Sequence, residues 1–187
     1  MSRRRLRFVL PAALVLGLAG ASLAIASGRD HGKSSSNQFT ATLIGHNETP
    51  AVHTAGRGKL SLTITANNTL SYTLTYSGLN TAASAAHVHF GQRNVAGGVS
   101  FFLCGGGSKP ACPAGTSSTA TVTGTVAASD VLALPTQGLA AGDVAAIVAE
   151  IRAGFTYGNV HTATSPAGEI RGQLRADEDE GDNGDHH

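Results

Sequence analysis

Aromatic residues are scarce in this sequence, and tryptophan is missing altogether. Phe, Tyr and Trp together make up 5% of the 187 residues, and beyond the N-terminal region the Lys and Arg residues are spread without clusters. A nucleic-acid partner requires a concentrated basic face with stacking aromatics. Paired glycosidase carboxylates normally lie in a cleft lined by aromatic side chains. The composition therefore argues against both functions.

Motifs of conventional catalysis are missing as well. The sequence has no nucleophile elbow, and the glycine run at residues 105–107 is not followed by the Lys-Ser/Thr pair of a phosphate-binding loop. We therefore name no catalytic residue and do not expect an enzyme.

Residues 1–26 have the pattern of a secretory signal peptide. A cluster of arginines precedes an apolar run at residues 8–26, which ends in Ala24-Ile25-Ala26, so we expect cleavage before Ser27. A retained membrane anchor is the alternative, because the run approaches the length of a transmembrane span. No later stretch is comparably apolar, so we expect a secreted or cell-surface product without a membrane segment.

The remaining chain divides into three parts by composition. Residues 27–38 are expected to form a flexible linker, and residues 39–175 have the length of one domain with a substantial core. Residues 176–187 form an acidic tail with nothing to bury, which predicts disorder. His186 and His187 in that tail are weak candidates for binding divalent metal.

Cys104 and Cys112 are the only cysteines, and they bracket a loop rich in Gly and Pro. In an exported chain this arrangement predicts a local disulfide. A thiolate metal site is the alternative, which an oxidising compartment disfavours.

Alternation of apolar and polar residues dominates the domain. Residues 60–65 and 70–76 alternate on either side of Asn67-Asn68, which predicts a hairpin with one buried face and one wet Ser/Thr face. Strands at this spacing predict a mainly β fold, an antiparallel and Greek-key-like sandwich or barrel. The other predicted strands are residues 39–44, 84–90, 99–103, 119–127, 156–162 and 169–174.

One segment has helical periodicity instead. Apolar residues recur at helical spacing after Asp143, which takes the N-cap position, and Gly154 follows as a C-terminal stop. We predict one amphipathic helix over residues 143–153, and a short helical turn over residues 130–134 before Pro135.

The candidate functional residues are three histidines. His87 and His89 are two positions apart in a predicted strand, so their side chains point to one face, about 7 Å apart. His161 lies in another predicted strand and joins them only if the fold brings the two strands together. Three imidazoles with an open position suit a mononuclear copper or zinc site. The alternative is a structural network of hydrogen bonds.

Other polar residues are candidates for the surroundings of such a site. Glu48 and Glu169 could accept imidazole N–H groups, and Glu169 shares a strand face with Arg171. His46 and His53 flank Glu48 in a loop; they are weaker candidates that we expect to be exposed.

These residues lie in short blocks that occur in a fixed order along the chain. The blocks are GHNETP at residues 45–50, AHVHFG at 86–91, IRAG at 151–154, NVHT at 159–162 and PAGEIRGQ at 166–173. In this combination the chain resembles the CHRD domain, named from chordin and common in exported bacterial proteins, over roughly residues 39–175. The resemblance implies an extracellular β-sandwich domain. It implies no particular activity, since growth-factor binding by chordin lies largely in other modules.

The stretch from His87 to Gly91 also resembles the copper-ligand strand of copper/zinc superoxide dismutase. That enzyme needs further histidines and an aspartate in a long loop, and residues 92–112 contain neither. A dismutase with both metals is therefore excluded on ligand count, whereas a mononuclear site is not.

Two function hypotheses follow. The first is an exported CHRD-type binding or structural module without a cofactor, whose partner is an unidentified extracellular protein, or a glycan on the wet Ser/Thr face. The second is a copper- or zinc-binding protein centred on His87, His89 and His161, with a redox or metal-handling role.

Overall fold

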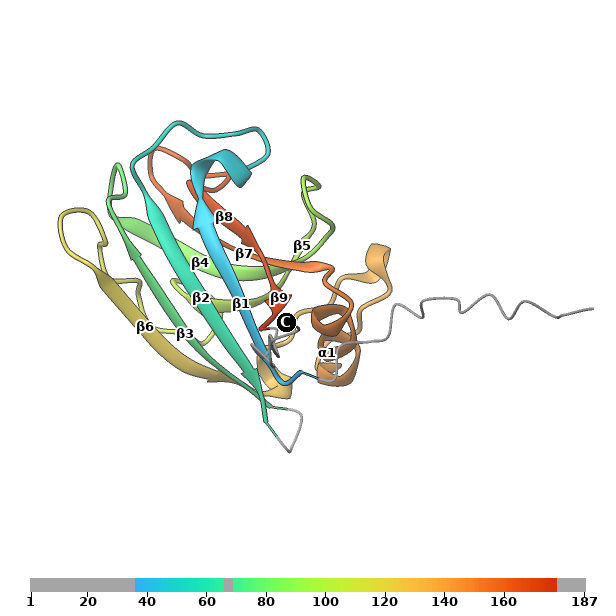
Figure 1. The fold of residues 1–187 in the computed structure, drawn as a ribbon. Coiled ribbons are helices and arrows are strands. Elements are labelled where there is room, and N and C mark those ends of the chain that lie inside the picture. Colours follow the sequence, from blue (N-terminus) through green and yellow to red (C-terminus); the bar gives the residue numbers. More distant parts are fainter. Residues whose placement is uncertain (1–35, 66–68, 178–187) are drawn as a thin grey trace, which may run out of the picture. The chain divides into compact units, whose positions relative to one another are not determined.

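The fold is one curled antiparallel sheet, described for residues 36–65 and 69–177 in a computed structural model (Figure 1). The expected signal peptide and the Asn67-Asn68 turn lie outside the described residues, as do most of the expected linker and acidic tail. No described helix is long and apolar enough to cross a membrane.

Nine strands make up the sheet. Along the sheet their order is β5-β4-β7-β8-β1-β2-β3-β6, and β9 also pairs with β1. In chain order they are β1 (Gln38–Ile44), β2 (Arg57–Ile64), β3 (Leu70–Ser77), β4 (Ala83–Phe90), β5 (Gly98–Cys104), β6 (Ala120–Val126), β7 (Thr156–Thr162), β8 (Ile170–Gln173) and β9 (Arg175–Ala176).

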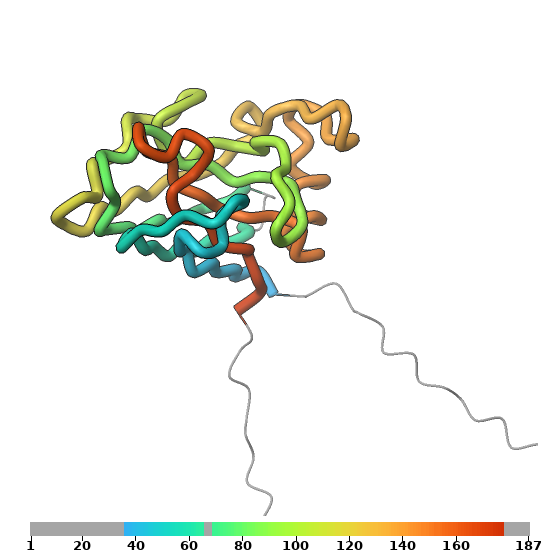
Figure 2. Tube along the Cα trace, turned by 90° about the horizontal axis from the view of Figure 1, so that it is seen from above, coloured from blue at the N-terminus to red at the C-terminus, as the bar shows by residue number. Residues whose placement is uncertain are grey.

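The curl nearly closes the sheet into a barrel. The two edge strands, β5 and β6, approach each other (Figures 1 and 2), although no ladder joins them within the described residues. Across this seam the Tyr72 hydroxyl of β3 donates to the carbonyl oxygen of Leu103 in β5, at 2.8 Å. The predicted mainly β, antiparallel architecture is confirmed, in the form of one continuous sheet.

The inner face of the sheet carries the core, as the alternation predicts. In β2, Leu60 and Leu62 are buried and pair with Leu74 and Tyr72 of β3, while Thr63 on the other face is exposed. In β2 and β3 every second side chain is thus buried, and burial of apolar surface is the main stabilising contribution to the fold.

The helix α1 (Val144–Arg152) confirms the helical prediction. The Asp143 side chain accepts a hydrogen bond from the Ala146 backbone N–H at 2.9 Å, which caps the helix N-terminus. At the other end Gly154 adopts a left-handed conformation with φ +78°, where a side chain would be strained. Three apolar residues of the helix are buried: Ile147, Val148 and Ile151.

The helical turn predicted over residues 130–134 is wrong. Short 3-10 turns lie on either side of it instead, η2 (Ala128–Asp130) and η3 (Pro135–Gln137). Pro135 begins the second turn rather than following one, because the first helical position does not need a backbone N–H. The predicted disulfide is confirmed: Cys104 and Cys112 are joined, with an S–S distance of 2.01 Å.

We expect Leu60→Ala to lower the free energy of unfolding by about 2–5 kcal/mol, because it leaves a cavity in the core. Thr63→Ala, on the exposed face of the same strand, should change it by no more than about 0.5 kcal/mol. Chemical denaturation of both variants measures the difference. Equal effects would contradict the assignment of inner and outer faces.

Candidate functional site

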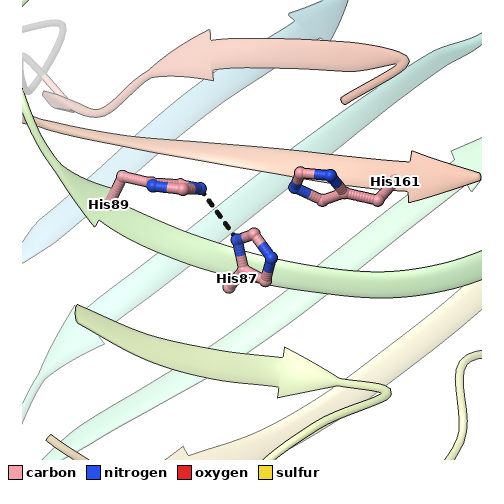
Figure 3. Close-up of side chains that lie close together, drawn as sticks. All are labelled: His87, His89 and His161. Atoms are coloured by element: carbon pink, nitrogen blue, oxygen red, sulfur yellow. Dashed lines mark hydrogen bonds between the residues drawn. The ribbon is translucent and has the colours of Figure 1, made fainter. Parts of the chain in front are cut away.

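The three histidines come from two neighbouring strands. β4 pairs with β7 in antiparallel register, with Ala85 opposite His161 and His87 opposite Asn159. Directly opposed residues point to the same side of a sheet, and so do residues two apart in one strand. The pairing therefore places His161 beside His87 and His89, as Figure 3 shows.

This face of β4 is the outer one. Ala86 and Val88, which alternate with the histidines, are fully buried in the core. His87 and His89 nevertheless have exposed fractions of only 7% and 8%. Side chains lying over the outer face of the sheet must therefore cover them.

Aromatic and cationic groups provide that cover. The Tyr157 ring stacks on His89 with centroids 4.6 Å apart, and the Arg171 guanidinium lies 3.4 Å from the centre of the same tyrosine ring. Phe102 of β5 meets His87 edge-on at 5.1 Å. These contacts exclude water from the rings and fix their orientations.

Burial keeps the rings neutral. The pKa of His87 is lowered from 6.5 to about 3, first by burial and then by the neighbouring His161 and His89. Burial is also the largest cause that lowers the pKa of His89 and of His161. All three imidazoles are therefore uncharged near neutral pH, which is the form that binds metal.

Two backbone carbonyls determine where the protons lie on these rings. His89 Nδ1 is 2.9 Å from the carbonyl oxygen of Gly97, and His161 Nδ1 is 3.0 Å from that of Pro166. A carbonyl oxygen only accepts hydrogen bonds, so both Nδ1 atoms carry the proton and donate. Each of these neutral rings consequently presents an unprotonated Nε2 to the centre of the cluster.

The side-chain oxygen of Asn159 lies between these two lone pairs. Its Oδ1 is 3.1 Å from His89 Nε2 and 2.9 Å from His161 Nε2. The remaining short contact joins His87 Nδ1 to His89 Nε2 at 2.8 Å (Figure 3). Since His89 Nε2 carries no proton, His87 Nδ1 donates, and this is the one ring proton directed into the cluster. The cluster therefore has more lone pairs than protons.

Glu48 lies beside the Asn159 amide. Burial is the first cause that raises the Glu48 pKa from 4.5 to about 7, while Arg171 and a hydrogen bond from Asn159 lower it. The Asn159 nitrogen lies on the Glu48 side of the amide, and its oxygen faces the histidines. Gly168 leaves room for this pair, because a Cβ there would lie 2.8 Å from Asn159 Nδ2 and closer still to Glu48 Oε1.

The three imidazoles can hold a metal ion after small movements and a shift of the His87 ring proton from Nδ1 to Nε2. One ligand atom from each ring lies within 4.8 Å of the other two. Nitrogen ligands of a tetrahedral zinc ion, at bonds of about 2.0–2.1 Å, are roughly 3.3 Å apart. To bind zinc, His87 Nδ1 and His89 Nε2, now 2.8 Å apart, would move slightly apart. The two ring nitrogens that are farthest apart would move closer together. The Nδ1–H donations to carbonyls are the usual support for metal-binding histidines.

The other residues named from the sequence have different surroundings. The Glu169 carboxylate is fully buried and accepts from the Thr54 and Thr162 hydroxyls and the Asn80 backbone N–H, at 2.6–2.8 Å, so it bonds to none of the histidines. Arg171 stacks on the Tyr157 ring rather than bonding to a histidine, and its charge helps to lower the pKa of His89. The predicted exposure of the loop residues is confirmed for His46 and His53.

Sequence reasoning missed Asn159 and Tyr157. Both were recognisable in principle, because they lie two and four positions before His161 and therefore share its strand face. The carbonyl of Gly97 had no signal in the sequence, since a backbone acceptor supplied by a loop depends on tertiary structure.

The fold and the cluster define an antiparallel, barrel-like β domain with a histidine-lined polar site on its outer face. A CHRD domain family model matches residues 39–174. The chain belongs to the CHRD domain family. A search of curated proteins and a search of solved structures gave no match.

The pKa of His87 has a consequence for stability in acid. Between the unfolded pKa of about 6.5 and the folded value of about 3, the unfolded state binds more protons, so the free energy of unfolding falls as the pH is lowered. Glu48 acts in the opposite sense: its contribution is fully present below pH 4.5 and is lost as the pH rises toward 7. Between pH 4.5 and 3 the contribution of Glu48 levels off as its unfolded form becomes protonated, so His87 contributes most of the slope of these two groups.

The slope to measure is that of the free energy of unfolding against pH in the metal-free protein. Between pH 4.5 and 3 we expect His87→Gln to reduce this slope by up to about 1.4 kcal/mol per pH unit. Denaturant unfolding at stepped pH, with a chelator present, measures the slope. The same slope in variant and parent would contradict a buried neutral His87.

Proposed function

We propose that the protein is an exported, extracellular binding module rather than an enzyme, and that its CHRD domain binds one copper or zinc ion through His87, His89 and His161. The observation that carries the proposal is the excess of lone pairs at the cluster. Two unprotonated Nε2 atoms face the Asn159 oxygen at 3.1 and 2.9 Å. A cation replaces this repulsion with coordination.

The chemistry of the ligand set favours late transition metals. Neutral imidazoles suit copper and zinc, whereas magnesium and calcium prefer sets made of oxygen ligands. The Asn159 oxygen is available as a fourth, weaker ligand. Both cysteines are joined in a disulfide, so neither offers a thiolate. The set therefore supports binding or handling of copper or zinc.

Export is proposed on separate grounds. The disulfide between Cys104 and Cys112 is typical of oxidising compartments. The sequence of residues 1–26 has the basic and apolar regions of a signal peptide. Membership of the CHRD family supports an extracellular location as well.

Calorimetric titration of the purified chain with Zn²⁺ and with Cu²⁺ tests the proposal. We expect one tight site per chain, which His89→Ala weakens by at least about 100-fold, because a direct ligand contributes more than the 10–100-fold of an outer partner. Asn159→Ala, which removes an outer partner or weak ligand, should cost about 10–100-fold.

Two matched controls separate this site from other histidines. His53→Ala removes an exposed imidazole elsewhere in the domain, and the double variant His186→Ala/His187→Ala removes the pair at the C-terminus. Neither should affect the tight site. Metal binding that survives His89→Ala, or that disappears with the C-terminal pair, would place the metal elsewhere and leave the cluster as a structural hydrogen-bond network.

A further inference from the structure

Basic side chains gather on the outer face of the sheet, next to the histidine cluster. In the sequence the cations of the domain are dispersed, and we expected no basic cluster. That expectation is wrong, because pairing of distant strands brings five cations around two neighbouring hollows. This basic face consists of Arg57, Lys59, Arg93, Arg171 and Arg175.

The two hollows meet at Thr42 of β1, which lines both. One has a volume of about 280 Å³ and extends over β8 and β9, and the other has about 290 Å³ and extends over β2 and β3. Thr42 pairs with Lys59 of β2, and Thr40 pairs with Arg175 of β9. Because β2 and β9 pair with opposite edges of β1, Lys59 and Arg175 flank β1 on its two sides, and the cations form a strip along the two hollows rather than a single spot.

The four exposed cations of this face form no ion pair within the described residues, whereas the charge of Arg171 interacts with that of Glu48. Arg57, Lys59, Arg93 and Arg175 are all exposed. The ion pair found in this part of the chain joins Lys109 to Asp130, neither of which belongs to the basic face. Unpaired cations around a concave surface raise the local concentration of anions.

Arg171 makes one wall of the strip rigid. Its Nη2 donates to the carbonyl oxygens of Gln92 and Val95, at 3.0 and 2.9 Å. Those residues flank Arg93, so the buried arginine fixes the loop that carries an exposed one. A fixed loop loses less entropy when a ligand binds.

Gln173 adds a fixed amide to the lining of the first hollow. Its Nε2 donates to the carbonyl oxygens of Gly91 and Gly154, at 3.1 and 2.8 Å, which fixes the orientation of the amide. Its Oε1 is buried and has no partner within the described residues. The uncharged polar lining of the same hollow is Thr40, Thr42, Asn47 and Gln173.

We propose that the basic face binds an acidic polysaccharide. Its uronate or sulfate groups pair with the cations, and its hydroxyls bond to the amides and hydroxyls between them. Single-stranded nucleic acid would require aromatic platforms for its bases, and the one aromatic residue lining the two hollows, Tyr76, is 1% exposed. This binding is separate from metal binding and does not depend on it.

The chain itself carries carboxylates that would compete for the basic face. The Thr40 hydroxyl donates to Asp177 Oδ1 at 2.7 Å, so one carboxylate already lies at the edge of the strip. Glu178, Asp179 and Glu180 follow in the sequence. The test therefore also uses a variant in which these three become amides: Glu178→Gln/Asp179→Asn/Glu180→Gln.

Binding of the full chain, and of the amide variant, is measured by calorimetry against polygalacturonate, heparin and neutral dextran. We expect the two acidic polymers to bind and dextran not to bind, with affinity falling as salt rises from about 50 to 200 mM. Arg93→Ala/Arg175→Ala and Arg57→Ala/Lys59→Ala should each reduce affinity about tenfold. Tighter binding of polygalacturonate would indicate recognition of uronate groups, and tighter binding of heparin would indicate recognition of sulfate groups.

Arg152→Ala is the matched control, because it removes a cation that lines neither hollow and bonds to Asn37 at 2.8 Å. It should leave affinity unchanged. The proposal is overturned if neither form of the chain binds the acidic polymers, or if Arg152→Ala weakens binding as much as the paired variants do. Equal binding of inorganic sulfate would show a simple anion site, and tighter binding of single-stranded DNA would show a nucleic-acid site; either result overturns it as well.

Discussion

The pairing of β4 with β7 is the constraint on which the rest of the site depends. Its antiparallel register places Ala85 opposite His161 and His87 opposite Asn159. A slip of one residue would send His161 and Asn159 to the core face, because side chains alternate along a strand. The buried Val88 and Val160 oppose such a slip, since it would move apolar side chains out of the core. Apolar burial on the inner face thus fixes the geometry of polar groups on the outer face.

The strands and two of the three histidines of the site could be predicted from the sequence, because both rest on local alternation. His87 and His89 share a face in any extended strand. The proximity of His161 could not be predicted, since it depends on which strands become neighbours some seventy residues apart. The basic face was missed for the same reason: Lys59, Arg93 and Arg175 come together only through tertiary structure. The helical turn predicted over residues 130–134 shows that a proline can be read as ending a turn when it begins one, as Pro135 does.

Arg171 connects the two polar features of the outer face. Its guanidinium stacks on Tyr157, whose ring stacks on His89, and the same residue lines the first hollow of the basic face. Its bonds to the loop that carries Arg93 hold that wall in place. One buried cation therefore supports both the shielding of the histidines and the shape of the neighbouring surface, which gives the outer face of this CHRD domain two distinct chemistries.

X-ray absorption spectroscopy of the protein loaded with one equivalent of Zn²⁺ tests the central claim most directly, because it counts the imidazoles bound to the ion. Convergence of His87, His89 and His161 predicts three imidazole nitrogens at about 2.0–2.1 Å, with one further light-atom ligand. A spectrum with a single imidazole, or one dominated by carboxylate and water oxygens, would contradict the account.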